Sequence, residues 1–344
     1  MDNENRGYPT ITIAILCHSS KAKLKKQLNW IDGLYKALPS ELQQRLYCFV
    51  SENASKDSVG TILAEFSEDR KWFSYCIQPE YVNYDLNVLT CYEKSQTDYV
   101  WLMAVDDYIC SERNIVEILN LLKQHNPSGV TFRITPEREI CPIDSKNIRI
   151  LHKPLDVLPA IEIGGGGKVS CNIIKKNAEL NRNNKNVASF IGVGYMHMTL
   201  QAICFELSEE KKFMRIDQQL VYSLQKWGDK NNHHPEFAIC SRDSIATSYF
   251  RRSCPDYFEI LSDKRILKLK FIVYQSIHSL LHCWDEEMLK YFIHKTVREC
   301  VKPPFSLKII FFLLISLSSL CLHPYYLKFI FSKPSESANP KYQL

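Results

Sequence analysis

The first hundred residues alternate between short apolar runs and amphipathic segments, and this alternation limits the possible folds more than any other feature of the chain. Apolar residues repeat at helical spacing in the segment with Leu24, Leu28, Ile31 and Leu34. Strands separated by helices predict right-handed βαβ crossovers, and therefore an α/β fold with a parallel, doubly wound sheet flanked by helices. Four apolar runs have the composition of buried strands: residues 11–16, 46–51, 73–77 and 99–105.

The start of each helix is also indicated by polar residues. We expect Ser19 and Ser20 to cap the first helix, and the second to start at Asp57 or Ser58. A third, short helix is expected from about Asp85.

Polar side chains follow three of the predicted strands directly. In a doubly wound sheet, ligands bind beyond the carboxyl ends of the parallel strands. The topology therefore predicts that these strand-end residues share one edge of the sheet. The residues are Cys17 and His18, Glu52 and Asn53, and Asp106 and Asp107.

The Asp106–Asp107 pair closes a strand predicted to be buried. Charges in such a place cost several kcal/mol unless another group offsets them. A divalent cation shared between carboxylates and phosphate oxygens is the natural compensation. The alternative is that both acids only cap the next helix, with Ser111 nearby.

The second half of the chain carries weaker signals. We divide it at residue 250: residues 126–250 complete a domain spanning 1–250, and residues 251–344 form a helical region. No internal repeat is present. The elements expected are a helix at 112–128, strand-like and turn-rich sequence at 129–160, a flexible run at Gly164–Gly167, a strand at 168–174, mixed short runs at 190–250 and two helices at 257–300.

An apolar segment near the C-terminus, residues 305–322, is interrupted by Lys308 and serines and followed by Pro324. Its length is at the lower limit for a transmembrane helix, which needs about 20 residues. Flanking lysines and tyrosines are typical of a segment that lies in the membrane interface. We expect residues 305–331 to associate with a membrane; a buried helix and a true span are the alternatives.

The composition excludes a disordered, a collagenous and a polytopic membrane protein. The chain has 344 residues, 45% hydrophobic and 24% charged, which is ordinary for a globular protein. A net charge of +5 is too small to indicate nucleic-acid binding but suits an acidic substrate or membrane surface. The 13 cysteines form no regular pattern, and residues 1–10 are polar, so we expect no secretory signal and a reducing cytoplasm.

Four segments together resemble the GT-A fold, family 2 glycosyltransferases, including the abequosyltransferase-like enzymes of bacterial surface polysaccharides. Each motif is weak alone, but their order and spacing match over residues 8–125. The segments are Ile13–Ser20, Val50–Ser58, the loop Tyr81–Asn87 and the strand Tyr99–Asp107.

This resemblance implies a nucleotide-sugar site made of Cys17, His18, Glu52, Asn53, Asp85, Asn87 and Asp106. Glu52 stands where the family has an Asp that binds the base, and Asp85 and Asn87 shape the phosphate side. Asp106 and Asp107 are implied to hold the ribose and a Mg²⁺ or Mn²⁺ ion on the diphosphate. This chain departs from the pattern in three places. Glu52 replaces an Asp and Asn83 replaces a Gly. Ala104 and Val105 stand where the family has acidic or small residues, so the first Asp of the metal motif is absent.

Catalytic bases are harder to place. The run Phe190–His197 resembles the acceptor-side segment of polysaccharide transferases in this family, which makes His197 a candidate base; the alternative is a structural histidine. Asp217 is the rival base. Lys168 can pair with a phosphate or can be a solvated surface lysine.

The function implied is transfer of a sugar from a nucleoside-diphosphate sugar to a lipid-linked glycan or growing surface polysaccharide, such as O-antigen or capsule. The resemblance also implies an inverting, metal-assisted reaction at the cytoplasmic face of the cell membrane. The alternative is a non-catalytic nucleotide-sugar-binding or scaffold protein of a polysaccharide assembly complex.

Overall fold

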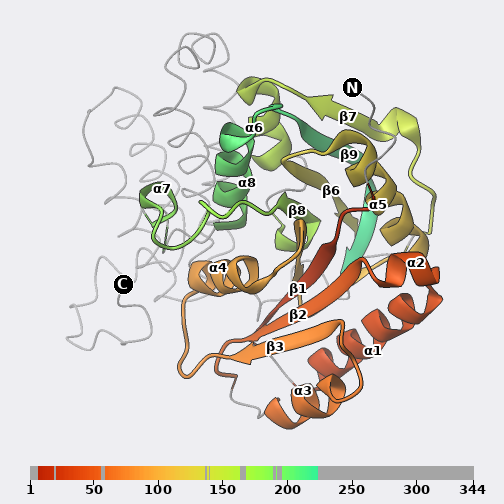
Figure 1. The fold of residues 1–344 in the computed structure, drawn as a ribbon, viewed down its shortest axis with the longest axis vertical. Coiled ribbons are helices and arrows are strands. Elements are labelled where there is room, and N and C mark those ends of the chain that lie inside the picture. The colour runs from red at the N-terminus through yellow and green to blue at the C-terminus, as the bar shows by residue number, and fades with distance from the viewer. Residues whose placement is uncertain are drawn as a thin grey trace, which may run out of the picture. The chain divides into compact units, whose positions relative to one another are not determined.

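A nine-stranded sheet organises the part of the chain that this computed structural model describes, with the strand order β3-β2-β1-β4-β8-β6-β9-β5 and β7 paired to β9 (Figure 1). The residues described are 7–18, 21–55, 59–135, 138, 140–162, 168–188, 191 and 196–223. They all lie in one compact unit, Met1–Trp227. The strands are β1 (Ile11–Cys17), β2 (Leu46–Glu52), β3 (Phe73–Ile77), β4 (Tyr99–Ala104), β5 (Asp107–Ile109), β6 (Gly129–Thr135), β7 (Ile148–Leu151), β8 (Asn172–Lys175) and β9 (Phe213–Ser223).

The half formed by β3, β2, β1 and β4 is parallel throughout, and its strands match those predicted from the apolar runs. They are joined through helices, as the βαβ pattern requires. The helices are α1 (Lys21–Ala37) with the short α2 (Ser40–Gln43), α3 (Gly60–Ser67) and α4 (Tyr84–Lys94). The α/β fold with helices flanking the sheet is confirmed.

The other half of the sheet is mixed. β8 pairs antiparallel with both β4 and β6, whereas β6 and β9 are parallel. β5 and β7 pair antiparallel with β9. Because β8 lies between β4 and β6, the two halves of the chain form one continuous sheet.

The structure changes the bounds or the type of several elements expected for this half. The helix expected at 112–128 is α5 (Glu112–His125), because Asn126 adopts φ 46° and ends it. The strand expected at 168–174 starts as a 3₁₀ turn, η3 (Val169–Cys171), and becomes β8 only at Asn172. The regions read as strand-like or mixed also contain η2 (Ser145–Asn147), α6 (Pro154–Glu162) and α8 (Met196–Leu207).

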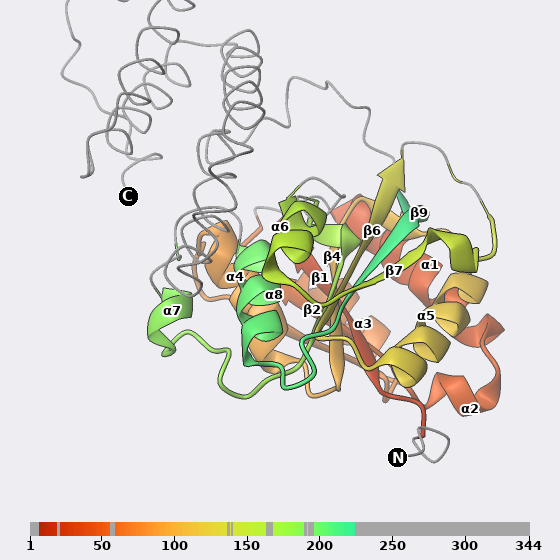
Figure 2. The same ribbon diagram turned by 90° about the horizontal axis from the view of Figure 1, so that it is seen from above.

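Helices cover both faces of the sheet (Figures 1 and 2). α1, α3 and α5 lie on one face, where their apolar side chains share a core with the strands. α4, α6, α7 (Lys185–Ala188) and α8 lie on the other face, and α4, α6 and α7 all pack on α8. The residues at the carboxyl ends of β1, β2 and β4 therefore lie between two helical layers.

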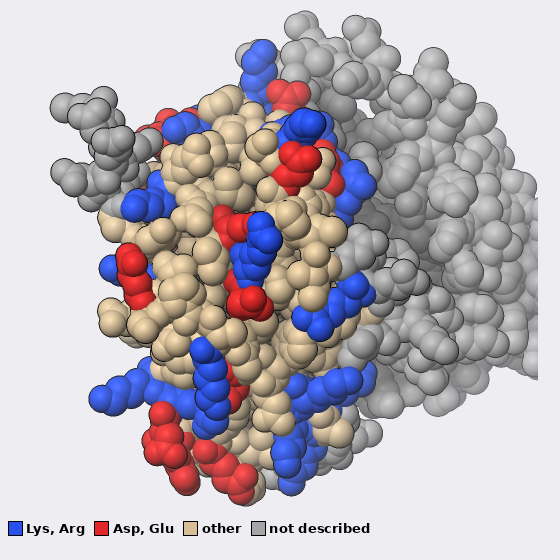
Figure 3. Space-filling view, turned by 90° about the vertical axis from the view of Figure 1, so that its right-hand side faces the viewer, with Lys and Arg blue, Asp and Glu red and all other residues tan. Residues whose placement is uncertain are grey.

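Figure 3 shows one face of the molecule, on which basic and acidic side chains are interspersed and most of the surface is neither. Within the described residues, no helix is both long and apolar enough to cross a membrane. Several predictions concern residues outside the described part: the caps at 19–20 and 57–58, the glycines at 164–167, most of 190–195 and everything from 224 on, including 305–331.

Candidate functional site

The predicted strand-end residues do share one edge of the sheet. Cys17 at the end of β1 is in register with Glu52 at the end of β2, and Leu16 is in register with Ala104 of β4. The Asn53 amide donates to the Cys17 carbonyl (2.8 Å), which continues the β1–β2 pairing beyond both strands. We call Cys17, His18, Glu52, Asn53, Asp106 and Asp107 the strand-end site.

Glu52 closes the turn that follows β2. Its Oε1 accepts a hydrogen bond from the Ser55 amide (2.5 Å), and the residue is 4% exposed. Within this turn Ala54 adopts φ 47°, a left-handed conformation that is uncommon for a residue with a side chain. Such conformations occur often at binding sites, where surrounding contacts hold them. The carboxylate of Glu52 is therefore fixed in place by the backbone.

Asn53 ties the β2 end to the loop that follows β3. Its side-chain Nδ2 donates to the Val82 carbonyl and its Oδ1 accepts from the Val82 amide, both at 2.8 Å. His18 Nδ1 donates to the Asn53 carbonyl (2.9 Å), and the His18 ring lies 4.8 Å from that of Tyr81. Tyr81 is 53% exposed, so this corner presents an exposed aromatic pair on a fixed loop.

Asp85 and Asn87 face inward from α4. Asp85 is 1% exposed, and its Oδ1 accepts from the Met196 amide (3.0 Å) at the start of α8. Asn87 Oδ1 accepts from Ser51 Oγ (2.6 Å) on β2. Both side chains therefore hold α4 against its neighbours, and they shape the site by positioning these elements.

Asp107 is buried behind the edge. Its Oδ2 accepts from Ser170 Oγ (2.5 Å) on η3, and Ser223 at the end of β9 is a second hydrogen-bond partner. Burial raises the pKa of Asp107 to about 6, although both serines lower it. Lys168, which is exposed, lowers the pKa as well, so Lys168 lies near this carboxyl group.

Asp106 is the more accessible of the two acids. Its side chain is 20% exposed, and its Oδ2 lies 3.4 Å from Lys23 Nζ of α1. Neither aspartate caps α5, because Ser111 does: its hydroxyl accepts from the Asn114 amide (3.3 Å). The helix-capping alternative for the pair is wrong.

The carboxylates at this edge fit a divalent cation that shares its shell with a ligand. Among the described residues, no group of three or more His, Cys, Asp or Glu is placed to hold a metal ion. Mg²⁺ needs no such cage, because it is commonly held by one or two carboxylates plus substrate phosphates. Asp106 has an accessible oxygen for this role, whereas Asp107 is already bound by serine hydroxyls.

Four residues around the two acids were missed in the sequence. Ser170, Ser223 and Lys23 contact the carboxyl groups, and none of them has a signal in the sequence, because the contacts are long-range. Gln27 donates from Nε2 to the carbonyls of Ala104 (2.7 Å) and Asp107 (2.9 Å). This glutamine had a signal, since it is a polar residue within the apolar stripe of α1.

His197 lies in the first turn of α8, where it is 1% exposed. Its Nδ1 is 3.1 Å from the Tyr84 hydroxyl in the first turn of α4. Because Asp85 joins the same two helix starts, the structure brings His197 to the α4 side of the sheet edge. This placement is compatible with both the base and the structural alternative.

Asp217 does not lie with the other candidates. It precedes Ser223 by six residues along β9, and its carboxylate is bound by Arg133, Arg149 and Arg215. Burial raises the pKa of Asp217, but hydrogen bonds from Arg215 and Arg149 outweigh this effect. The pKa of Asp217 is therefore lower than its usual value. A carboxylate with a lowered pKa and two arginine partners is a poor proton acceptor.

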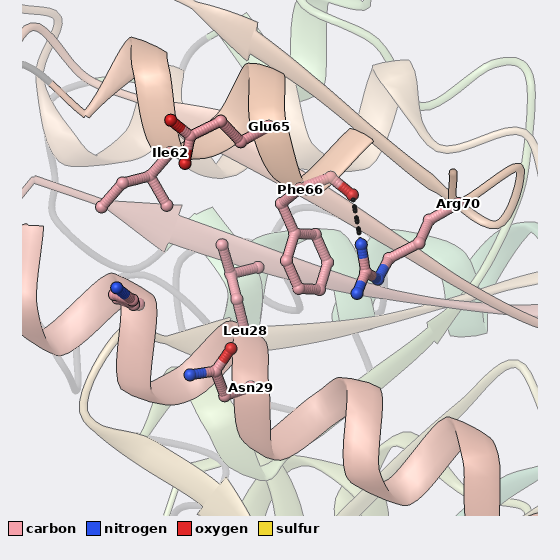
Figure 4. A pocket seen from close by; sticks show the side chains of 7 residues that line it. Leu28, Asn29, Ile62, Glu65, Phe66 and Arg70 are labelled. Carbon is pink, nitrogen blue, oxygen red and sulfur yellow. Dashed lines mark hydrogen bonds between the residues drawn. The ribbon is translucent and has the colours of Figure 1, made fainter. Parts of the chain in front are cut away.

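A separate hollow of about 210 Å³ opens between α1 and α3 (Figure 4). Arg70 borders it and donates to the Phe66 carbonyl (3.1 Å). No residue of the strand-end site lines this hollow. Its lining consists of Lys25, Leu28, Asn29, Ile62, Glu65, Phe66 and Arg70.

Comparisons with known proteins give only distant likenesses. No family model matches the sequence. No curated protein matches it either. Among solved structures, residues 1–349 of S. aureus TarS are 9% identical, with a TM-score of 0.47, over 93% of this chain and 83% of that one. The same TarS fragment in complex with UDP-GlcNAc is 8% identical, with a TM-score of 0.47, over 90% and 89%.

A mannosyltransferase, PcManGT from Pyrobaculum calidifontis, in complex with GDP-Man and Mn²⁺, is 13% identical, with a TM-score of 0.47, over 95% of this chain and 84% of that one.

Proposed function

We propose that this protein is a GT-A glycosyltransferase that takes its sugar from a nucleoside-diphosphate sugar bound at the strand-end site. The observation that carries the proposal is the meeting of Cys17, Glu52 and Val105–Asp107 at one sheet edge. Three of the four motif segments contain the strand ends that meet at this edge, and the fourth, Tyr81–Asn87, is tied to it through Asn53. A chance match of weak motifs gives no reason for this convergence.

Each residue then has a role that its contacts support. Glu52, fixed by Ser55, accepts hydrogen bonds from the base, and Cys17, His18 and Asn53 border the nucleoside. Asp106 faces the ribose and diphosphate, and Asp85 and Asn87 hold the loop on the phosphate side. A Mg²⁺ or Mn²⁺ ion held mainly by Asp106, with Asp107 behind it, would neutralise the leaving diphosphate.

His197 is our candidate for the base in an inverting transfer. It lies in the first turn of α8, and Tyr84 fixes its ring on the Nδ1 side. An inverting transferase needs one group to remove the proton from the acceptor hydroxyl. Asp217 is less suited to this role because its pKa is lowered.

The acceptor in this proposal is a lipid-linked glycan or growing surface polysaccharide, and the enzyme works at the cytoplasmic face of the cell membrane. The dense apolar sequence of residues 305–331 supports the membrane part of the proposal. Charged substitutions at Ile310 and Leu314 should move the protein from the membrane fraction to the soluble fraction, while donor binding is kept. Unchanged fractionation would contradict membrane association through this segment.

A second function, nucleotide-sugar binding without catalysis, is favoured by one observation. Val105 replaces the first acid of the metal motif, and Asp107 is bound by Ser170, which leaves Asp106 as the accessible carboxylate. A scaffold protein would bind the donor and release no nucleoside diphosphate.

One experiment separates these functions. The full chain is screened by thermal shift against UDP-, GDP-, CDP- and dTDP-sugars, and the best ligand is then tested for hydrolysis with Mn²⁺ and with chelator. A ligand at 100 times its dissociation constant stabilises the fold by about 2.7 kcal/mol. Binding with hydrolysis supports the transferase, and binding alone supports the scaffold. The absence of any shift would contradict both.

A further inference from the structure

Three arginines on three neighbouring strands converge on Asp217. Arg215, on the same strand β9, places Nε 2.8 Å and Nη2 2.7 Å from Asp217 Oδ1. Arg133 of β6 reaches the same oxygen from Nη2 at 3.3 Å. Arg149 of β7 donates from Nη2 to the other carboxylate oxygen. We call these four residues the arginine cluster.

The sheet is built irregularly at this point. Arg149 and Arg215 are direct cross-strand neighbours. On the other side, Thr131 pairs with Arg215 but Arg133 pairs with Gln219, so β9 inserts extra residues around Asp217. Bulges of this kind re-aim side chains and are frequent beside functional sites. Here the irregularity lies where Asp217 meets its arginines.

The charges in the arginine cluster do not balance. Among the described residues, the three guanidinium groups share one carboxylate within ion-pair distance, that of Asp217. Three positive groups share one negative group, which leaves a formal excess of two positive charges. By contrast, Arg113 forms a one-to-one pair with Glu117 on α5.

The excess charge is accessible. The side chains of Arg133 and Arg149 are 57% and 54% exposed, whereas those of Arg215 and Asp217 are 18% and 17% exposed. The guanidinium fork matches phosphate oxygens in geometry and can donate two hydrogen bonds at once. Because Asp217 already orients the three side chains, a ligand loses less conformational entropy in ordering them.

We propose that the arginine cluster is a binding site for a phosphate or diphosphate group, separate from the strand-end site. The two sites share no residue: Asp217 lies at the irregularity in β9, whereas Asp107 pairs with Ser223 at the carboxyl end of the same strand. The group comes from a soluble phosphate ester or from a lipid headgroup, since both present the same oxygens. This site does not depend on the activity proposed above.

The test compares two arginines of similar exposure, Arg149 at 54% and Arg113 at 58%. Arg149→Gln removes one charge from the arginine cluster, and Arg113→Gln removes one from a balanced pair on α5, where the side chain is 58% exposed. Binding of pyrophosphate to the full chain is measured by calorimetry at low ionic strength. Binding to vesicles of phosphatidylcholine, with and without phosphatidic acid, is measured by flotation, and melting temperatures check folding.

We expect Arg149→Gln to weaken phosphate binding about tenfold, the loss of one charge-assisted hydrogen bond, and Arg113→Gln to leave it unchanged. If Arg149→Gln loses pyrophosphate binding, the ligand is a soluble phosphate ester. If Arg149→Gln loses only the binding to vesicles with phosphatidic acid, the ligand is a lipid headgroup. Either result supports the site. Equal effects of both substitutions, or no binding of either probe by the wild-type chain, would overturn it.

Discussion

Ser170 donates a hydrogen bond to the carboxylate of Asp107 across 63 residues of sequence, and this contact keeps a buried acid next to the candidate donor site. Burial makes the ionised form of Asp107 unfavourable in the folded protein. Burial raises its pKa from 3.8 to about 6, so folding favours the protonated form. The stability that Asp107 contributes is complete below pH 3.8 and is lost as the pH rises through 6.

The first prediction is that Asp107→Asn stabilises the fold at neutral pH. The rise of the Asp107 pKa from 3.8 to about 6 corresponds to roughly 3 kcal/mol at pH 7. Weaker hydrogen bonding between the amide and the serines reduces this gain. We expect a gain of about 1–2 kcal/mol at pH 7 that disappears near pH 4. Urea unfolding of both proteins across this range measures the difference, and a gain that is independent of pH would contradict the assignment.

A second prediction separates Asp106 from its neighbour. Asp106→Asn should lower sugar transfer by about 100-fold, the scale of losing one electrostatic contact to the transition state, with little change in stability. Asp98→Asn is the matched control, because Asp98 accepts from Thr10 at the opposite end of β4. Steady-state transfer in Mn²⁺ and thermal melting provide the measurements. Near wild-type turnover of Asp106→Asn would remove this residue from the site.

The third prediction distinguishes the two candidate bases. His197→Gln should reduce transfer by about 10²–10⁴-fold, the range of a lost general base, while Asp217→Asn should stay within about threefold of wild type. Circular dichroism checks that the His197 variant, which is altered at a buried position, remains folded. The opposite ranking of the two variants would make Asp217 the base despite its arginine partners.

A fourth prediction concerns the start of α8. Replacing Asp85 by Ala removes the acceptor for the Met196 amide and should cost about 0.5–2 kcal/mol, whereas Asp85→Asn should cost less, because its amide oxygen can still accept. Asp156→Ala, in the exposed first turn of α6, is the control. Chemical denaturation gives the free energies of unfolding. Equal, negligible effects of all three substitutions would show that the cap is not stabilising.

The parallel half of the sheet was predictable because its strands are continuous apolar runs that end abruptly in polar residues. α8 was not predictable by the same reasoning. It is buried from Met196 to Phe205 without a break, so it has no polar stripe and therefore no helical period to detect. The 3₁₀ turn before β8 was missed for a related reason: its residues, Val169–Cys171, are compatible with a strand.

Some features of the candidate site were also predictable from the sequence, and others were not. The backbone positions of Cys17, Glu52 and Asp107 followed from topology, because parallel strands end at a common edge. The partners of the site residues did not follow, since Ser170 reaches Asp107 and Met196 reaches Asp85 from distant segments that carry no local signal. Asp217 shows the limit most clearly: the neighbouring Arg215, two positions away on the same strand face, was visible, but Arg149 and Arg133 reach it from other strands.

The position of β8 between β4 and β6 has a consequence for how this protein is made. While the ribosome is still synthesising the first half, β4 has an open edge, because its partner β8 starts only at Asn172. Asp107 lacks its serine Ser223 until later still. The nascent chain therefore exposes the unpaired edge of β4 while about 70 further residues are synthesised. At about 5–20 residues per second, this takes about 3–14 seconds. We expect this interval, more than the finished fold, to determine how much of the protein is lost to aggregation when it is overproduced.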